Sequence, residues 1–509
     1  MTGLAVAAPN PAAADAAEQV ARAGGSAVDA AIAAALVAMV NEVGLVSLSS
    51  GGFVAVQPAA GAAYTVDGWV DRPGIGRAPD AEPSRTWDVT TAYGGGVTIT
   101  IGPGSVATHG SLAAFGEAHA RDGRLPWREL VAPALDVARG GFRLGAASRY
   151  YLDHVHETVF GWDRASHEAL HDEDGRVTAD RVVVADLAGT LEHVSDAGPR
   201  ALHEGDLAAL LAADLQARGG LLGAADLAAY APVVRAPLTT RVGGWRLATT
   251  PPPSVGGVVV ASMLRLLDGH PLAGWDDADV AHLVRVQRAV LGHRREVLET
   301  ASGLDAASRA WLDRVDADHR AVLESGSTAH VSVTDAEGAA CSITVSSGYG
   351  AGMIAAGTGI WLNNCLGEQE LNPPGRTVAP GARLLSNMAP TVGRHDDGAT
   401  LAIGSPGADR ITTAVVSALA GFVNGDLDLA AAVAHPRVHV HRAGLPDEEV
   451  RVEHEPSMYY GGVGAALTGA DGHLEAVADP RRDGVSRLIS SWHPPSPSRA
   501  AGSSTPPSV

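Results

Sequence analysis

One segment, residues 325–364, constrains the fold of this chain more than any other part of it. From Thr328 to Thr334 the even positions are polar and the odd positions between them are apolar, which predicts a strand with two different faces. A similar run covers 340–345, and the intervening Asp-Ala-Glu-Gly at 335–338 favours a tight turn. We therefore expect an antiparallel hairpin in which the hydroxyl of Thr328 faces that of Thr344.

Composition limits the classes of function open to the chain. The sequence has 509 residues, a formal net charge of −20 and no lysine. Such a charge argues against nucleic acid and anionic membranes as partners. Without lysine, neither a pyridoxal phosphate Schiff base nor a P-loop can form, and we expect no cofactor. The cysteines, Cys341 and Cys365, are expected to be reduced thiols.

The two ends of the sequence carry separate signals. The N-terminus lacks a basic segment followed by an apolar run and a small-residue cleavage site, so we expect no secretory signal and a cytoplasmic location. Residues 10–43 predict two alanine-rich helices divided at Gly24-Gly25, the second apolar on nearly all sides like a buried helix. The Pro/Ser-rich tail 490–509 is expected to be disordered.

The central segment contains the patterns T-x-H-x-S-V, D-x-x-G, G-x-G-x-x-A and G-I-x-L-N-N. Together they resemble the gamma-glutamyltranspeptidase family of N-terminal nucleophile (Ntn) hydrolases, and the similarity extends over about residues 5–487. The resemblance implies an α+β fold, the four-layer αββα sandwich of these enzymes. It also implies one domain formed by two fragments, 1–327 and 328–509, which remain together as a heterodimer after the precursor cleaves itself before Thr328.

The chemistry of the family explains why a threonine heads the motif. A threonine hydroxyl is a weak nucleophile until a base removes its proton, and a freed α-amino group, with a pKa of about 8, can act as that base. Thr328 would supply both groups. Attack of its hydroxyl on the carbonyl of Ser327 would give an ester that water opens, so one side chain would serve both maturation and turnover.

A second motif, Gly-Ser-Pro-Gly-Ala-Asp-Arg at 404–410, precedes a predicted helix over 411–422. In the family two successive backbone N–H groups at this turn form the oxyanion hole, and the match places them at Gly407 and Ala408. Backbone donors at a helix N-terminus stabilise a developing negative charge whatever the side chain. Thr344 would be a further catalytic partner on the hairpin.

The residues that hold the substrate in the family are only partly retained. Trp69 stands where an arginine normally binds the substrate carboxylate, and Arg72 is a possible substitute. In the loop that holds the glutamyl ammonium, the matching positions are Cys365 and Glu368. The family's pair of carboxylate-binding serines is Ser386 and Asn387 here, and Ser346 replaces an asparagine. The resemblance therefore predicts retained catalytic machinery and an altered glutamate pocket.

Histidines offer weaker candidates. His435, His439 and His441 include a pair that would share a strand face, but the sequence nominates no third ligand for a metal, so we expect no metal site. His330, beside the proposed nucleophile, is expected to be a structural hydrogen-bonding residue rather than a base.

These features favour an autoprocessing acyltransferase or hydrolase that acts on a small gamma-glutamyl or related acyl compound. Two alternatives remain open at this point. Some family members in natural-product pathways are thought to hydrolyse a carbon–carbon bond next to a carbonyl, in the synthesis of pyrroline or propylproline precursors. The chain could also be a non-catalytic binding scaffold that retains the fold. Whether the precursor cuts itself would separate the scaffold from the enzymes.

Overall fold

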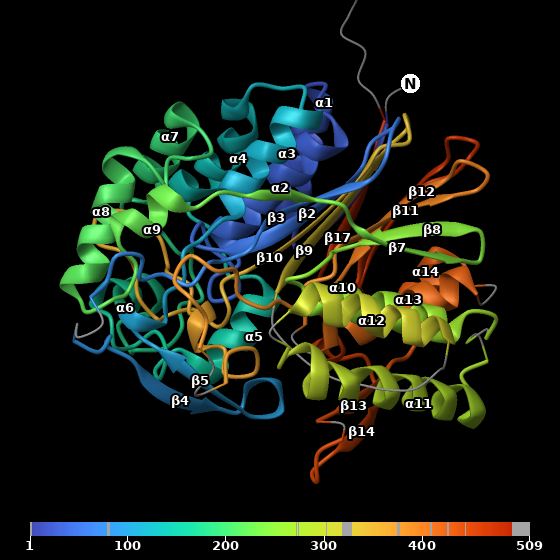
Figure 1. Ribbon diagram of the computed structural model, residues 1–509. Coiled ribbons are helices and arrows are strands. Elements are labelled where there is room, and N and C mark those ends of the chain that lie inside the picture. The colour runs from blue at the N-terminus through green and yellow to red at the C-terminus, as the bar shows by residue number, and fades with distance from the viewer. Residues whose placement is uncertain are drawn as a thin grey trace, which may run out of the picture.

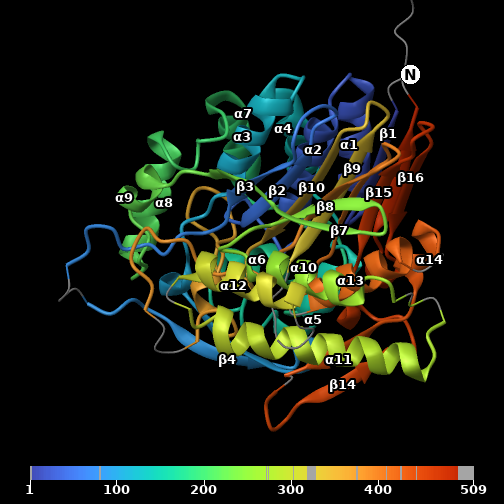
Figure 2. The ribbon, with the colours of Figure 1, turned by 45° about the vertical axis from the view of Figure 1, so that its right-hand side comes forward.

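The computed structural model describes residues 3–78, 82–270, 272, 274–301, 303–317, 328–373, 377–407, 410–424, 427–442 and 444–490. Two antiparallel sheets face each other at its centre, and helices cover the outer face of each sheet (Figures 1 and 2). This arrangement confirms the four-layer αββα sandwich implied by the resemblance. No helix among the described residues is both long and apolar enough to cross a membrane.

The first sheet has seven strands, and the hairpin lies at its middle. Their spatial order is β17 (Val485–Ile489), β1 (Leu4–Ala8), β9 (Ala329–Asp335), β10 (Ala340–Ser346), β2 (Gly51–Gln57), β3 (Tyr64–Gly68) and β6 (Val233–Arg235). Strands from the two ends of the sequence, β1 and β17, thus lie together on one side of the central pair, and β2 lies on the other. The order makes this sheet depend on both fragments that the resemblance predicts.

The second sheet has six strands. Their order is β16 (Leu474–Ala478), β15 (Gly464–Thr468), β12 (Thr400–Gly404), β11 (Thr391–His395), β8 (Trp245–Thr249) and β7 (Leu238–Val242). Two small ribbons lie outside the sandwich: β4 (Trp87–Thr91) with β5 (Val97–Ile101), and β13 (Val438–His441) with β14 (Glu449–Val452).

Helices from two parts of the chain form the outer layers. The first sheet is covered by α1 (Pro11–Arg22), α2 (Ala27–Asn41), α3 (Ser111–Asp122) and α4 (Trp127–Gly140), with α7 (Leu187–Ala197) packed on α4. The second layer contains α10 (Val255–Leu267), α11 (Asp277–His293), α12 (Leu304–Ala317), α13 (Arg410–Val423) and α14 (Leu429–Ala434). The shorter α5 (Ala146–Val155), α6 (Arg164–Leu170), α8 (Gly205–Ala217) and α9 (Ala224–Ala229) complete the N-terminal half.

The period-two pattern of the hairpin explains how it sits between two different environments. Its odd-numbered side chains, such as Val331 and Ile343, join the core formed with α2, every residue of which is buried. Its even-numbered side chains face the second sheet, where the Oγ of Ser342 donates to the carbonyl of Ile403 on β12 (3.0 Å). The predicted strands and the predicted buried helix are confirmed, and the hydroxyl-bearing face lies between the sheets.

Candidate active site

The register of the hairpin decides which hydroxyl faces Thr328. Val345 pairs with Ala329 and Thr344 pairs with His330, so the next antiparallel pair sets Ser346 opposite Thr328. Our expectation that Thr344 faces Thr328 is therefore wrong. The residue opposite Thr328 lies two positions further along β10, on the same face of the sheet. The Oγ1 of Thr344 instead lies 2.9 Å from the Nδ1 of His330.

His330 belongs to a buried chain of hydrogen bonds. The Oγ of Ser332 donates to the carbonyl of Gly464 (3.1 Å), so Ser332 can only accept from the Nε2 of His330 (2.7 Å). The Nδ1 of His330 then accepts from the hydroxyl of Thr344. Burial lowers the pKa of His330 to about 3. The imidazole is therefore neutral, and both of its ring nitrogens are hydrogen-bonded, in agreement with a structural role.

Thr328 lines a small pocket, with about 180 Å³ of space that includes open solvent, in which several polar atoms have no partner. The pocket is lined by Trp69, Thr328, Ser346, Glu368, Leu371, Ser386, Asn387 and Met388. Within the described residues, Thr328 Oγ1, Glu368 Oε1 and both side-chain polar atoms of Asn387 are buried without a hydrogen bond. Buried polar atoms are normally paired, so this concentration indicates a place for a ligand.

Glu368 is the acidic side chain of this pocket. Burial, reinforced by repulsion from Glu370, raises the pKa of Glu368 to about 8, although a hydrogen bond from Cys365 opposes that shift. Burial, followed by the nearby Glu368, raises the pKa of the Cys365 thiol, so the thiol remains a neutral donor. Cys365 starts the short helix η4 (Cys365–Gly367) behind the pocket and does not line it.

Trp69 forms an apolar wall where the family normally has its arginine. Its Nε1 donates to the carbonyl of Leu385 (2.8 Å), and its ring stacks on Phe53 with centroids 6.4 Å apart. The indole N–H is therefore committed to the protein. The Oγ of Ser386 accepts from the backbone N–H of Met388 (3.2 Å), which orders this loop beside the pocket.

The nearby arginines do not line the pocket. Arg72 exchanges backbone hydrogen bonds with the segment 381–382 and is absent from the lining. Sequence reasoning missed Arg383, whose guanidinium binds Asp71 (2.6 Å) and Asp67 (3.2 Å). No local sequence signal joins Arg383 to these acids, because more than 300 residues separate them. Among the described lining residues, Glu368 is thus the one with an ionisable side chain.

The predicted oxyanion turn lies where β12 leads into α13. Gly407 has a φ of +131°, and an added Cβ would meet the Cα of Gly461 at 2.8 Å, so glycine suits this position. Ser405 secures the turn, because its Oγ donates to the carbonyl of Pro406 (2.6 Å) and accepts from the N–H of Gly462 (3.0 Å). Ala408 lies outside the described residues, as does Ser327.

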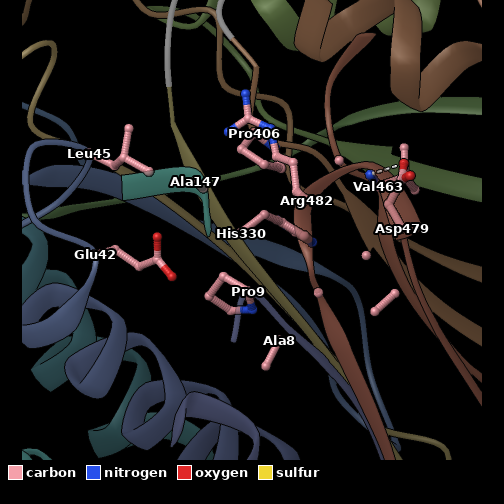
Figure 3. Close-up of a pocket in the computed structure, with 14 residues that line it drawn as sticks. Ala8, Pro9, Glu42, Leu45, Ala147, His330, Pro406, Val463, Asp479 and Arg482 are labelled. Atoms are coloured by element: carbon pink, nitrogen blue, oxygen red, sulfur yellow. Dashed lines mark hydrogen bonds between the residues drawn. The ribbon is translucent and has the colours of Figure 1, made fainter. Parts of the chain in front are cut away.

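A second pocket lies beside this turn and reaches His330 (Figure 3). Pro406, Glu42 and Arg482 also line it. The Asn10 amide donates to Glu42 Oε1 (2.6 Å), and burial raises the pKa of Glu42. A largely apolar pocket that contains Glu42 and Arg482 therefore flanks the oxyanion turn.

Other histidines form no comparable centre among the described residues. His439 is buried on β13, with its Nδ1 3.3 Å from the Oγ1 of Thr413, whereas His435 is partly buried. The described part of the chain contains no group of three or more His, Cys, Asp or Glu side chains placed to hold a metal ion.

Two antiparallel sheets between helical layers, with a hydroxyl residue at the start of a central strand, define the Ntn-hydrolase class. Within that class the chain belongs to the gamma-glutamyltranspeptidase family, whose model, gamma-glutamyltranspeptidase, matches residues 13–489. The resemblance noted in the sequence is therefore confirmed.

Individual relatives are enzymes of this hydrolase and acyltransferase type. The chain is 27% identical to the glutathione hydrolase proenzyme of Escherichia coli (strain K12), covering 90% of this chain and 87% of that protein. It is 28% identical to the acylase ACY 1 proenzyme of Pseudomonas sp. (strain V22), covering 94% and 92%. Its fold is similar to that of the cephalosporin acylase from Bacillus halodurans, with a TM-score of 0.75 at 20% identity and coverage of 97% and 96%. The chain is an enzyme of this family.

Proposed function

We propose that this protein is an autoprocessing Ntn hydrolase in which Thr328 is the nucleophile of both maturation and turnover. The observation that carries the proposal is the unpartnered, buried Oγ1 of Thr328 in a pocket where Glu368 and Asn387 also present unpartnered polar atoms. Membership of a family whose relatives are proenzymes supports a precursor that cuts itself.

Maturation would begin with attack of the Thr328 Oγ1 on the carbonyl carbon of Ser327. The C–N bond to Thr328 breaks as the C–O bond forms, and the threonine nitrogen becomes a free amine. Water then hydrolyses the ester, which leaves a carboxylate on Ser327 and restores the hydroxyl. The products, 1–327 and 328–509, would stay together because the first sheet takes strands from both.

Turnover repeats the same bond exchange on a small acyl compound. The new α-amine of Thr328 accepts the hydroxyl proton, and Oγ1 attacks the substrate carbonyl. The backbone N–H groups of Gly407 and Ala408 would stabilise the oxyanion, a contribution of about 3 kcal/mol for a single donor. The amine passes the proton to the leaving group, and water or an acceptor amine releases the acyl group. Ser346 lies opposite Thr328, so its hydroxyl joins that of Thr344 as a candidate catalytic partner of Thr328 during turnover.

The pocket favours an acyl group with an ammonium and without a carboxylate. Glu368 can pair with a cation once its carboxyl has released its proton, which a bound ammonium favours. Trp69 supplies no positive charge, and its N–H is already bonded. A carboxylate desolvated without a cation would cost several kcal/mol. Ser386 and Asn387 offer only uncharged hydrogen-bonding groups there, so they cannot supply the missing counter-charge.

Processing provides the first test. Purified wild-type protein should separate into two fragments on a denaturing gel, with Thr328 at the new N-terminus by mass spectrometry. Thr328→Ala should remain one chain of 51.8 kDa and be inactive. Thr334→Ala is the matched control, since Thr334 Oγ1 is also buried and unpartnered on β9 but lies outside the pocket. Active protein that stays intact would overturn the proposal.

Three matched anilides test the acyl group. The γ-glutamyl anilide carries an ammonium and a carboxylate, the 4-aminobutyryl anilide only the ammonium, and the butyryl anilide neither. We expect kcat/KM to be at least as high for 4-aminobutyryl as for γ-glutamyl, and lowest for butyryl. A γ-glutamyl preference of about tenfold, worth 1.4 kcal/mol, would contradict this pocket argument and leave the role of Thr328 intact.

A further inference from the structure

Three arginines form a row across the second sheet, at a distance from the proposed active site. The strand register sets Arg241 of β7 opposite Arg246 of β8, and Arg246 opposite Arg394 of β11. Directly paired residues in an antiparallel sheet share a face. Ala248, two residues after Arg246, packs between the two sheets with Ala55 and Ala340, so the arginine row faces that same gap.

Among the residues that the structure describes, a carboxylate partner is found for one of the three arginines. Arg241 binds both oxygens of Asp396, at 2.8 and 3.0 Å. Arg394 donates to the carbonyls of Pro58, Ala59 and Gly338, and its Nε is buried without a partner. Arg246, which is exposed, has no ion pair with any residue that the structure describes. Like charges directly opposite on neighbouring strands are destabilising.

Arg246 and Arg394, the two arginines without a described carboxylate partner, line a groove at the open end of the sandwich. The groove holds about 1130 Å³ of space that includes open solvent. Half of the twelve residues that line it are polar or charged, namely Gln57, Thr239, Arg246, Arg394, His395 and Asp396. Its one carboxylate, Asp396, is already held by Arg241, and the His395 ring contacts Asp397 (2.9 Å). The groove is therefore positively charged in a chain whose net charge is −20.

We propose that this groove binds a small multivalent oxyanion, a phosphate or a polycarboxylate, between Arg246 and Arg394. The planar guanidinium of Arg246 can match such an oxyanion with two parallel hydrogen bonds. Arg394, whose Nη atoms already bond three carbonyls, adds its charge and its unpartnered Nε, and an anion would relieve the repulsion between the two cations. Arg394 contacts Gly338 in the turn of the hairpin, whereas Thr328 lies at the opposite end of the same hairpin. Roughly 20 Å of strand, at about 3.3 Å per residue, separates the two places.

Titration calorimetry of the intact protein tests the groove with phosphate and with citrate, at constant ionic strength maintained with sodium chloride. We expect saturable binding of at least one of them. Arg246→Gln should weaken it by about tenfold or more, because charge-assisted hydrogen bonds are lost. Arg128→Gln is the control, since it removes one exposed arginine charge from α4, outside the groove.

Thermal unfolding supplies a second readout. Arg246→Glu should abolish the anion-dependent rise in Tm and raise the Tm without anion, because a carboxylate there can pair with Arg394. Binding of phosphate alone would assign a phosphoryl ligand, and binding of citrate alone a polycarboxylate. Equal affinity in wild type and Arg246→Gln would overturn the proposal, as would phosphate and citrate effects no larger than that of chloride.

Discussion

Glu368 shows how one buried acid can link the pocket to pH. Its carboxyl has an unpartnered Oε1 and a pKa raised to about 8 by burial and by Glu370. Between its ordinary value of 4.5 and about 8, the unfolded chain loses this proton while the folded chain keeps it. The unfolded state then binds fewer protons, so this group lowers the stability as pH rises through that window.

We predict that Glu368→Gln removes this loss of stability. The comparison is made in the Thr328→Ala background, so that one uncut chain unfolds. From pH 5 to pH 8, the free energy of unfolding should fall by at least about 1 kcal/mol more with Glu368 than with Gln, since one pKa unit corresponds to about 1.4 kcal/mol. Urea unfolding at both pH values measures the difference. Parallel pH dependences would show that Glu368 ionises normally.

Gly404 tests the hydrogen-bond chain through His330. A Cβ at Gly404 would lie 2.4 Å from the Cε1 of His330, so the ring would have to leave Thr344 and Ser332. We expect Gly404→Ala to lower the free energy of unfolding by about 2 kcal/mol through overpacking and lost hydrogen bonds. Gly140→Ala, where a Cβ meets nothing within 4 Å, is the control and should be neutral or slightly stabilising. Equal effects of the two changes would refute the argument.

At the scale of elements, Asp29 shows how one side chain can start a helix and anchor a loop. It forms a capping box with Ser26 at the start of α2: the N–H of Ser26 donates to its Oδ2 (2.9 Å), and its own N–H donates to Ser26 Oγ (3.1 Å). The same Oδ2 accepts the backbone N–H groups of Arg124 and Leu125, at 2.8 and 3.2 Å. The carboxylate therefore ties α2 to the segment before α4.

We predict that Asp29→Ala lowers the free energy of unfolding by about 2–4 kcal/mol, because a helix cap is lost and buried N–H groups lose their acceptor. Denaturant unfolding in the Thr328→Ala background measures this cost. Asp15→Ala on α1 is the control: Asp15 makes an exposed ion pair with Arg487 (3.2 Å), and its loss should cost less than about 0.5 kcal/mol. A cost for Asp29→Ala no greater than the control's would mean that water replaces the carboxylate.

Elements with a local signal were predictable from the sequence. The hairpin, α1, α2 and α13 were expected close to their observed bounds, because alternation, helical periodicity and turn residues act over a few positions. Register was not predictable to the same degree. Pairing Thr328 with Thr344 keeps every side chain on its correct face, and only the assembled hairpin distinguishes it from the observed pairing with Ser346.

At the scale of the whole molecule, a buried ionic cluster joins segments near the C-terminus. Asp479 binds Arg437 (2.6 Å) and Arg481 (3.1 Å), and Arg481 also binds Glu453 (2.6 Å). Arg437 donates to the carbonyl of Tyr460 (2.8 Å), which precedes the Gly461 that packs against the oxyanion turn. The cluster therefore holds the segment that packs against the oxyanion turn.

We predict that Asp479→Asn costs about 3–5 kcal/mol at neutral pH, because two buried guanidinium groups lose their counter-charge. Burial alone would raise the pKa of Asp479, but the attraction of Arg437 and Arg481 outweighs it and lowers the pKa below the ordinary 3.8. The higher stability of wild type relative to Asp479→Asn is thus present above pH 3.8 and should disappear as pH falls further. Asp471→Asn, in an exposed turn, is the control for the unfolding measurements. An undiminished advantage at strongly acidic pH would contradict the ion-pair explanation.

The sequence alone identified the family, because its motifs are written in consecutive residues, and the resemblance then implied the sandwich and the candidate nucleophile. Tertiary structure decided which residues come together: Ser346 lies opposite Thr328, and Arg383 binds two acids far away in the chain. It also aligned Arg241, Arg246 and Arg394 across three strands. Such contacts depend on strand register and sheet packing, and these are fixed only when distant segments bury their apolar faces together.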